Sequence, residues 1–245
     1  GYYAYLRSGV IDGDFDFFNE KRYHHFGSIS KTGYTVNYWY IGAAILWLPF
    51  FLIGHGVAWL YGAMGYPVAP DGYSFPYHAF TFLASACEVF VALILCYKIL
   101  QKFYSRSASL LTTVLVFTGS CLPYFTFIRN RMSHSGDALA GFAFFLLFLN
   151  FRERFETKPG ERLPSFSFFL FWGALAGLLV DLRYISVVYC VLPLGIALKT
   201  VLDPTTTETE KRRLKHGVGL AFLAFLITVA PQLAAWKKLH GVFSS

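Results

Sequence analysis

A short polar cluster stands at the start of one of the chain's long apolar stretches. It comprises Arg129, Arg131, Ser133, His134 and Asp137. His134 and Asp137 are three residues apart, so they would share one face of a helix. Two guanidinium groups can hold a phosphate through paired hydrogen bonds, and a nearby carboxylate can accept a proton or orient a base. The cluster therefore predicts a site for an anionic substrate and for proton transfer.

The same residues also have a structural interpretation. Ser133 could cap the helix, Asp137 would then lie favourably in its first turns, and the arginines could anchor the chain at a membrane interface. We favour the functional interpretation, because acidic side chains inside an apolar span usually face a cavity or a partner.

A second polar cluster holds three carboxylates at alternate positions, Asp12, Asp14 and Asp16. A calcium-binding EF-hand loop needs glycine at its sixth position and glutamate at its twelfth, and here these positions are Phe17 and Tyr23. An Asp-x-Asp pair also binds metal and nucleotide-sugar in soluble glycosyltransferases, but the sequence does not indicate their alternating strands and helices. A solvated turn, in which the Asp side chains accept backbone hydrogen bonds, is weighed equally with a functional role.

Three further ionisable residues fall in or beside apolar stretches. Glu88 is near the middle of the stretch 78–99, where a charge is costly, so we expect a structural hydrogen bond to a neighbouring helix. Asp181 and Arg183 flank a turn and could neutralise each other, and Arg183 could also bind an anionic lipid head group. We assign no metal ligands, although a divalent metal ion stays open as a cofactor.

The composition indicates that these residues belong to a membrane protein. Of 245 residues, 56% are hydrophobic and 14% are charged, whereas roughly a quarter of the residues in a soluble protein are charged. This argues against a disordered chain and against a free cytosolic enzyme. The net charge of +7 fits basic cytoplasmic loops better than nucleic-acid binding.

Six apolar runs are suited to cross the roughly 30 Å hydrocarbon core as helices. They are 78–99, 108–128, 133–151, 166–182, 184–202 and 217–236. Lysine and arginine gather in the alternate loops 98–107, 152–163 and 199–215, which are therefore expected on the cytoplasmic side. The predicted fold class is all-α, with a polytopic transmembrane helix bundle over 78–236.

The run 38–61 has two interpretations. It is rich in Trp and Tyr and contains Pro49, which is typical of an interfacial or re-entrant helix, but a tilted, proline-kinked span would show the same features. An interfacial helix leaves residues 1–37 in an outer loop, whereas a crossing places them in the cytoplasm. Charge counting does not decide between the two.

Five segments carry a family resemblance. They are 1–8 (GYYAYLRS), 12–17 (DGDFDF), 19–20 (NE), 41–50 (IGAAILWLPF) and 131–137. Together they resemble bacterial membrane proteins of the GT-C glycosyltransferase superfamily, relatives of the protein O-mannosyltransferases and the aminoarabinose lipid A transferases. The resemblance implies an interfacial helix at 38–61 and sugar transfer from a polyprenyl-phosphate donor at the non-cytoplasmic face. In the family, an acid just before a segment like 1–8 is the base, so that acid is expected upstream and this chain is expected to be an N-terminal portion.

The resemblance also implies roles for residues of this chain. Asp137 matches the family's second acidic position, and Arg131 lies where a basic residue often precedes it. We expect an inverting hexosyltransferase, a multi-pass protein of the bacterial inner membrane, whose partners are membrane lipid, the lipid-linked donor and an acceptor that the sequence does not identify. The expected catalytic residues are Asp137, Asp12 and Asp14. The expected substrate-binding residues are Arg131, His134, Arg129, Arg183 and Asp16.

Two other functions remain open. A transporter or flippase for a lipid-linked or anionic solute would line a path with Glu88, Asp137 and Arg183, and a non-catalytic family member would act in assembly. A transporter needs polar groups through the thickness of the membrane, whereas an outer-face enzyme gathers them at one end.

Overall fold

A computed structural model of the chain describes residues 1–20, 29–157 and 163–243. Within these ranges the regular structure is helical, apart from an isolated β-bridge between Ile29 and Thr35. The helices are α1 (Tyr2–Arg7), the π-helix η1 (Ser8–Asp12), α3 (Gly42–Ala63), α4 (Phe75–Leu100), α5 (Arg106–Thr118), α6 (Leu122–Phe127), α7 (His134–Thr157), α8 (Phe166–Leu182), the 3-10 helix η2 (Tyr184–Cys190), α9 (Val191–Leu202) and α10 (Glu208–His240). The predicted all-α class is confirmed.

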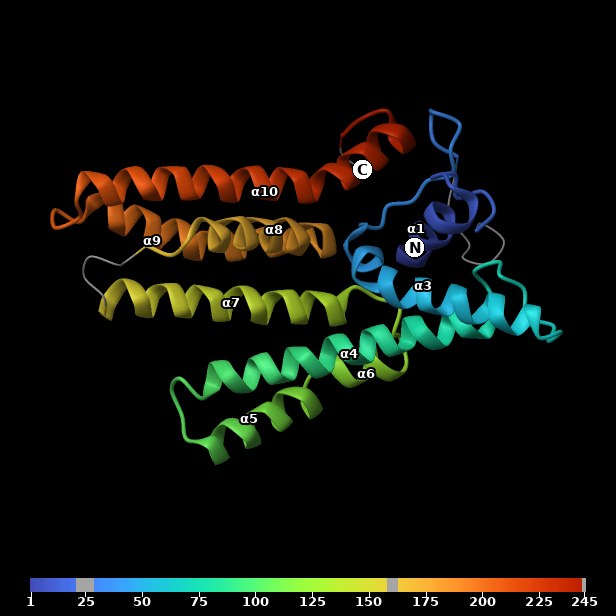
Figure 1. Cartoon of the computed structure of the whole chain (residues 1–245), viewed down its shortest axis with the longest axis horizontal. Helices are drawn as coiled ribbons and strands as arrows, with labels where there is room; N and C mark the ends of the chain where they lie inside the picture. Colours follow the sequence, from blue (N-terminus) through green and yellow to red (C-terminus); the bar gives the residue numbers. More distant parts are fainter. Residues whose placement is uncertain (21–28, 158–162, 244–245) are drawn as a thin grey trace.

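The helices have the lengths and composition of a membrane protein. In the described ranges, five segments are long and apolar enough to cross a membrane, and they are Gly42–Ala63, Phe75–Leu100, His134–Glu156, Tyr184–Leu202 and Glu208–His240. Two further apolar helices are shorter, α8 with 17 residues and α5 with 13. In Figure 1, α7, α8, α9 and α10 lie side by side along one direction, and α4 packs beside α7. The predicted helical membrane bundle is therefore confirmed.

The predicted span 108–128 is wrong as a single helix. Gly119 follows the end of α5, and α6 begins only at Leu122. The Ser120 hydroxyl oxygen accepts a hydrogen bond from the Leu122 backbone N–H at 3.2 Å. Pro123 fits the first turn of the new helix because that position needs no N–H donor. The 13 residues of α5 reach only roughly 20 Å, which is less than the hydrocarbon core.

α3 is one continuous helix of 22 residues that passes through Pro49, so the proline does not break it. Its first residue, Gly42, packs against Asp181 in the last turn of α8, where an added Cβ would lie 2.5 Å from the carbonyl oxygen. From this contact α3 runs past the N-terminal end of α7 and pairs with the first half of α4 (Figure 1). Gly54 of α3 packs against the first turn of α4. The interfacial or re-entrant position of 38–61 stays a prediction, because α3 is also long and apolar enough to cross a membrane.

α8 and α10 are held together by close backbone packing. Gly173 and Gly177 place a small-xxx-small motif on α8. A Cβ on Gly173 would lie 2.0 Å from the Ala221 carbonyl oxygen, and one on Gly177 would lie 2.8 Å from the Thr228 Cβ. In lipid, helices associate through such van der Waals packing because the surroundings are as apolar as the side chains. Glycine at these two positions therefore sets the distance between α8 and α10.

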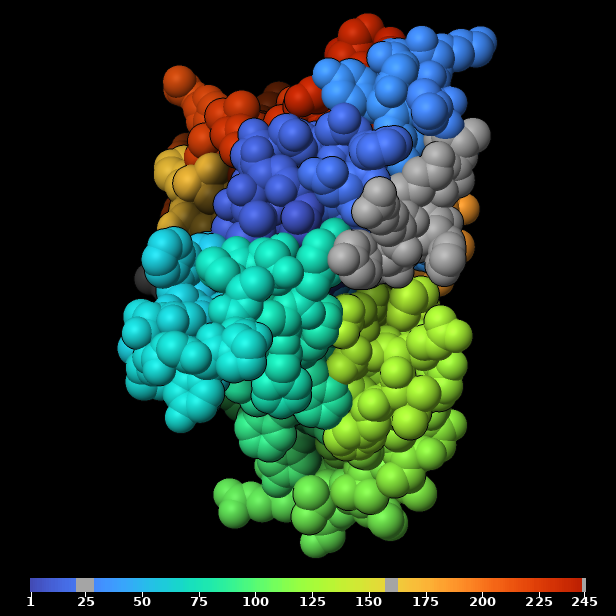
Figure 2. All heavy atoms as spheres, turned by 90° about the vertical axis from the view of Figure 1, so that its right-hand side faces the viewer, coloured from blue at the N-terminus to red at the C-terminus, as the bar shows by residue number. Residues whose placement is uncertain are grey.

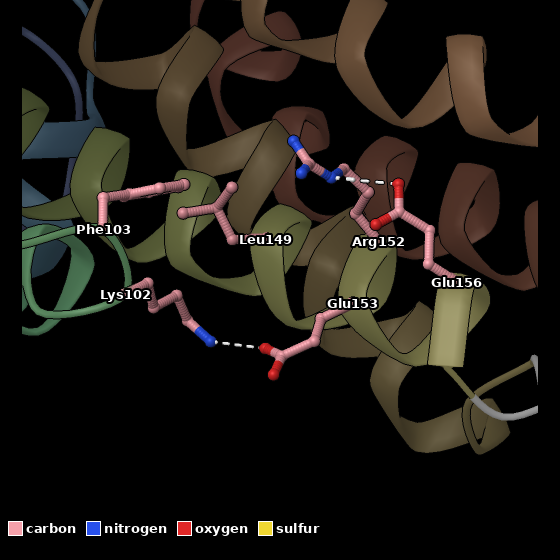
Figure 3. A pocket seen from close by; sticks show the side chains of 6 residues that line it. All are labelled: Lys102, Phe103, Leu149, Arg152, Glu153 and Glu156. Carbon is pink, nitrogen blue, oxygen red and sulfur yellow. Dashed lines mark hydrogen bonds and ion pairs between the residues drawn. The ribbon is translucent and has the colours of Figure 1, made fainter.

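One end of the bundle carries the predicted cytoplasmic loops. There, Lys102 at the end of α4 pairs with Glu153 of α7 at 2.7 Å, and Arg152 pairs with Glu156 through Nε at 3.3 Å (Figure 3). Exposed pairs of this kind contribute little to stability, about 0 to 1 kcal/mol each. Their importance here is that they mark where α7 leaves its apolar stretch.

The N-terminal segment lies at the opposite end. Figure 2 looks onto this end, where α1 (blue) lies against α3 and α4 (cyan) and close to the loop before α7 (yellow-green). The Arg7 side chain contacts the Asp71 carbonyl oxygen, and the Tyr2 hydroxyl contacts Ser133. The segments 1–20, 62–77 and 129–133 therefore meet at one end of the molecule.

Candidate functional site

The polar end of the bundle is built by α7, α8 and η2. α7 begins at His134 and α8 ends at Leu182. Because the two helices pack antiparallel, these two termini lie together. Arg183 follows α8 directly, and η2 then carries Ser186 to the first turn of α7.

His134, Asp137, Arg183 and Ser186 form what we call the α7 cluster. Arg183 Nη1 lies 3.1 Å from His134 Nδ1 and 3.9 Å from Asp137 Oδ2. The Ser186 hydroxyl donates a hydrogen bond to Asp137 Oδ1 at 2.7 Å. The structure thus brings together three of the predicted site residues and adds a serine that the sequence analysis missed. The sequence held a weak indication of Ser186, because it follows Arg183 by three residues and the two would share one face of a helix.

The hydrogen bond from Arg183 assigns the tautomer of His134. A guanidinium group only donates hydrogen bonds, so His134 Nδ1 must accept, and the neutral ring carries its proton on Nε2. The Phe125 ring covers the imidazole, with ring centres 3.7 Å apart. The side chains of Asp137 and Arg183 are 22% and 43% exposed. The cluster therefore offers an accessible carboxylate, a ring N–H and a guanidinium to a ligand.

α1 docks on the loop before α7 through two tyrosines. The Tyr2 hydroxyl lies 2.9 Å from Ser133 Oγ, and the Arg131 guanidinium lies over the Tyr3 ring, 5.2 Å from its centre. Burial lowers the pKa of Arg131, and no carboxylate of the described residues forms an ion pair with it. A half-buried guanidinium held by an aromatic ring is suited to bind an anion. Arg129, on the same loop, is exposed.

Glu88 lies closer to this end than its place in the sequence indicates. It is in the middle of α4, yet its Oε2 accepts a 2.6 Å hydrogen bond from Ser135 in the first turn of α7. The first half of α4 extends past α7 toward α3 (Figure 1), so the middle of α4 is level with the beginning of α7. The predicted hydrogen bond to a neighbouring helix is confirmed. The position of Glu88 deep in a membrane stays a prediction, because α4 is itself long and apolar enough to cross one.

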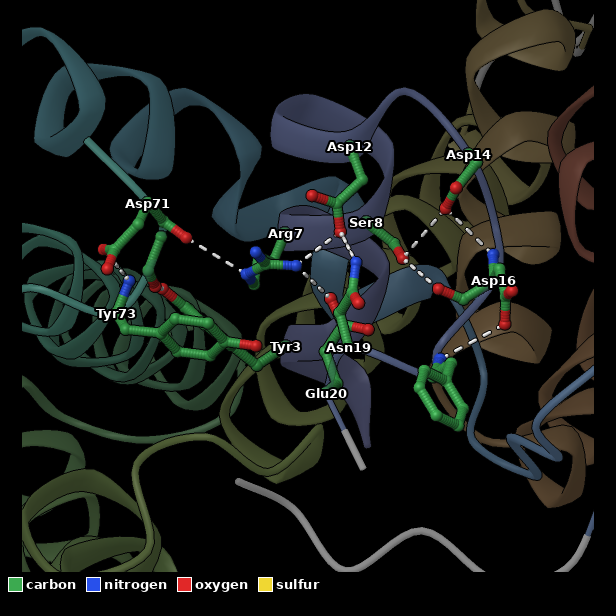
Figure 4. A network of polar contacts seen from close by, with 12 residues as sticks. Tyr3, Arg7, Ser8, Asp12, Asp14, Asp16, Asn19, Glu20, Asp71 and Tyr73 are labelled. Carbon is green, nitrogen blue, oxygen red and sulfur yellow. Dashed lines mark hydrogen bonds and ion pairs between the residues drawn. The ribbon is translucent and has the colours of Figure 1, made fainter. Parts of the chain in front are cut away.

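A polar network around Arg7, which the sequence did not predict, is drawn in Figure 4. Arg7 Nη1 pairs with Asp12 and, at 2.9 Å, with Glu20, while Nε donates to the Asp71 carbonyl oxygen at 3.0 Å. The guanidinium lies 4.5 Å from the centre of the Tyr73 ring. Burial raises the pKa of Glu20, although the bond from Arg7 opposes this. Glu20 and Asp71 are 13 and 64 residues from Arg7, so no local pattern indicated these contacts.

The three alternate carboxylates of the first loop make structural contacts. Besides the pairing of Asp12, Asp14 Oδ1 accepts from the Asp16 backbone N–H at 2.9 Å, and Asp16 Oδ1 accepts from the Phe18 N–H at 3.2 Å. These are the backbone hydrogen bonds that the turn interpretation predicted. They lie beyond the C-terminal end of α1, whereas the Tyr2 contact to Ser133 is at its N-terminal end. A catalytic role for Asp12 and Asp14, and substrate binding by Asp16, stay predictions.

A metal site does not emerge from this geometry. In residues 1–20, 29–157 and 163–243, no three His, Cys, Asp or Glu side chains are grouped closely enough to hold a metal ion. The function must be inferred from the α7 cluster and Arg131. Comparison of the chain with models of known protein families, with curated proteins and with solved structures finds no match.

Proposed function

We propose that this chain belongs to an integral membrane glycosyltransferase of the GT-C type, which transfers a sugar from a polyprenyl-phosphate donor at the non-cytoplasmic face. The α7 cluster carries the proposal, because a carboxylate, an imidazole and a guanidinium from two separate segments meet at one end of a membrane-type bundle. That end is opposite the basic loops, which favours the non-cytoplasmic side. The N-terminal segment that resembles the family packs on the same end.

The proposed reaction joins the acceptor oxygen to the anomeric carbon of the sugar and breaks the bond from that carbon to the lipid phosphate. In this chain we assign the role of base to Asp137, in place of the upstream acid that the family resemblance implies. Asp137 accepts the proton of the acceptor hydroxyl, and Ser186 orients the carboxylate through its hydrogen bond. Arg183 and Arg131 stabilise the negative charge on the departing polyprenyl phosphate. The acceptor attacks from the face opposite the phosphate, so the configuration of the sugar inverts.

The distribution of charge supports an enzyme over a transporter. α7 has no ionisable residue between Asp137 and Arg152, and α8 has none before Asp181. Glu88, which a transport path would need at mid-depth, is level with Ser135 at the start of α7. The ionisable side chains of α7 and α8 are therefore near the ends of these two helices, as expected for chemistry at a membrane surface.

Sugar transfer in reconstituted membranes tests the proposal. The full chain in liposomes that contain bacterial inner-membrane acceptors is supplied with radiolabelled mannosyl- or glucosyl-polyprenyl phosphate, and movement of label out of the lipid donor is measured. Asp137→Asn should lower the rate at least about 100-fold, since a positioned general base contributes that much or more. Glu153→Gln, at the other end of α7, is the control and should leave the rate unchanged.

Two results would contradict the proposal. Equal rates for Asp137→Asn and the unchanged protein would reject Asp137 as the base. Label that crosses the bilayer while still attached to its lipid, and stops crossing in Glu88→Gln, would instead identify a transporter.

A further inference from the structure

A groove lies between α7 and α9, at the end of α7 that is remote from the α7 cluster. Its volume is about 290 Å³. Its walls are mainly apolar, with Phe148, Val191 and Ile196 among them. Its charged lining residues are Arg152, Lys199 and Glu156, the acid that pairs with Arg152. An apolar groove whose charged lining of two cations and one acid is net positive has the chemistry of a site for an amphipathic anion.

The wall of this groove is open at Gly195. A Cβ on Gly195 would meet no heavy atom within 4 Å, so α9 leaves space there that the chain does not fill. Leu194 and Leu198, beside it on α9, are exposed apolar side chains of a segment apolar enough to cross a membrane. Apolar space of this kind is suited to a hydrocarbon chain and not to water.

The distance of Arg152 from the start of α7 suits a position among lipid head groups. From His134 to Arg152, α7 rises roughly 27 Å, which is close to the thickness of the hydrocarbon core. Arg152 pairs with Glu156 through Nε at 3.3 Å, and its terminal nitrogens point away from that carboxylate (Figure 3). Lys199 Nζ lies 5.8 Å from the centre of the Phe155 ring and has no acidic partner among the described residues.

A neighbouring groove, which shares Arg152 and Glu156 with the first, provides a contrast in its lysine. It has a volume of about 220 Å³ and is lined by Lys102, Phe103 and Leu149, among others. Its lysine is already paired with Glu153 at 2.7 Å (Figure 3). Charge complementarity to an anion therefore favours the groove that contains Lys199.

We propose that the groove between α7 and α9 binds an anionic phospholipid of the cytoplasmic leaflet. The phosphate binds Lys199 and Arg152, and one acyl chain lies along Gly195 between the two helices. Basic pockets between transmembrane helices on the cytoplasmic side bind anionic head groups in this way. The lipid site is remote from the α7 cluster, so its existence does not depend on the proposed sugar transfer.

Native mass spectrometry of the full chain in detergent, titrated with dioleoyl phosphatidylglycerol or dioleoyl phosphatidylcholine, tests this site. We expect tighter binding of phosphatidylglycerol. Lys199→Gln should weaken that binding about fivefold, the effect of one basic residue near an anionic head group, and should leave phosphatidylcholine unaffected. Gly195→Leu should weaken the binding of both lipids because it fills the groove.

Two matched controls lie on α10. Lys215 is exposed, and a Cβ on Gly219 would meet nothing within 4 Å, as at Gly195. Lys215→Gln and Gly219→Leu should therefore leave the affinity for both lipids unchanged. All four positions are exposed, so the variants should also keep the melting temperature of the unchanged protein.

Three outcomes would overturn the proposal. Equal affinity of the unchanged protein for the two lipids would remove the head-group preference. Equal phosphatidylglycerol affinity of Lys199→Gln and Lys215→Gln would show that the charge at Lys199 is not part of a site. Unchanged lipid binding by Gly195→Leu would exclude an acyl chain from the groove.

Discussion

Arg7 and Glu20 form the most buried ion pair at the polar end of the molecule, with side chains 10% and 0% exposed. Replacing Arg7 with leucine leaves the Glu20 carboxylate buried without its cation. We expect Arg7→Leu to destabilise the folded protein by about 3 to 5 kcal/mol, as removal of one partner of a buried pair does. Chemical unfolding in detergent, followed by tryptophan fluorescence, measures this change.

The double variant Arg7→Leu/Glu20→Leu separates the buried charge from lost packing. Because it removes the uncompensated carboxylate as well, it should recover much of the stability lost in the single variant. A double variant as unstable as Arg7→Leu would show that the Glu20 charge is not the cause of the loss.

For individual residues, spacing in the sequence predicted contacts within one helical turn and few others. His134 and Asp137 share a face because they are three residues apart, and Arg183 was identified from its place beside a turn. The partners of Arg7 at Glu20 and Asp71 could not be predicted, because they are brought together by the docking of the first loop on the segment before α4.

The contact between α8 and α10 depends on a residue without a side chain. Since a Cβ on Gly173 would lie 2.0 Å from the Ala221 carbonyl oxygen, Gly173→Leu must push the two helices apart. We expect a loss of about 3 kcal/mol or more in unfolding free energy, at or above the upper end of the cost of overpacking. Thermal unfolding in detergent provides the measurement.

Gly219→Leu is the matched control for this element. It makes the same substitution on α10 at a position where a Cβ meets nothing within 4 Å. Its melting temperature should not fall below that of the unchanged protein, because leucine favours a helix more than glycine does. A similar loss in both variants would indicate that leucine does not act through the contact of α8 with α10.

Apolar length predicted where helices exist better than where they end. The run 108–128 is apolar throughout, but Gly119 and Pro123 divide it into α5 and α6. Pro49, in contrast, does not end a helix, and α3 continues through it without a break. The level of Glu88 relative to α7 could not be predicted, because it depends on how far α4 is offset along α7, which is a property of packing and not of either helix.

The sidedness of the whole molecule is testable without a substrate. Asn19, Arg129 and Ser105 are exposed, and single cysteines at these positions can be introduced after removal of the four native cysteines, Cys87, Cys96, Cys121 and Cys190. In intact cells, we expect an impermeant thiol reagent to label Asn19→Cys and Arg129→Cys. Ser105→Cys should react only after the membrane is permeabilised, because it lies in a basic loop.

Protection of Asn19→Cys together with labelling of Arg129→Cys would contradict this arrangement. It would place the first loop and the start of α7 on opposite sides of the membrane. The contact of Tyr2 with Ser133 would then be excluded, and the run 38–61 would have to cross.

The close approach of Gly42 to the end of α8 has a mechanical consequence. An added Cβ at Gly42 would lie 2.5 Å from the Asp181 carbonyl oxygen and 2.6 Å from the Leu182 nitrogen, so the backbones of α3 and α8 are in direct contact here. The next residue along the chain is Arg183, which binds both His134 and Asp137. A force that tilts the hairpin of α3 and α4 therefore reaches the α7 cluster through a rigid backbone contact.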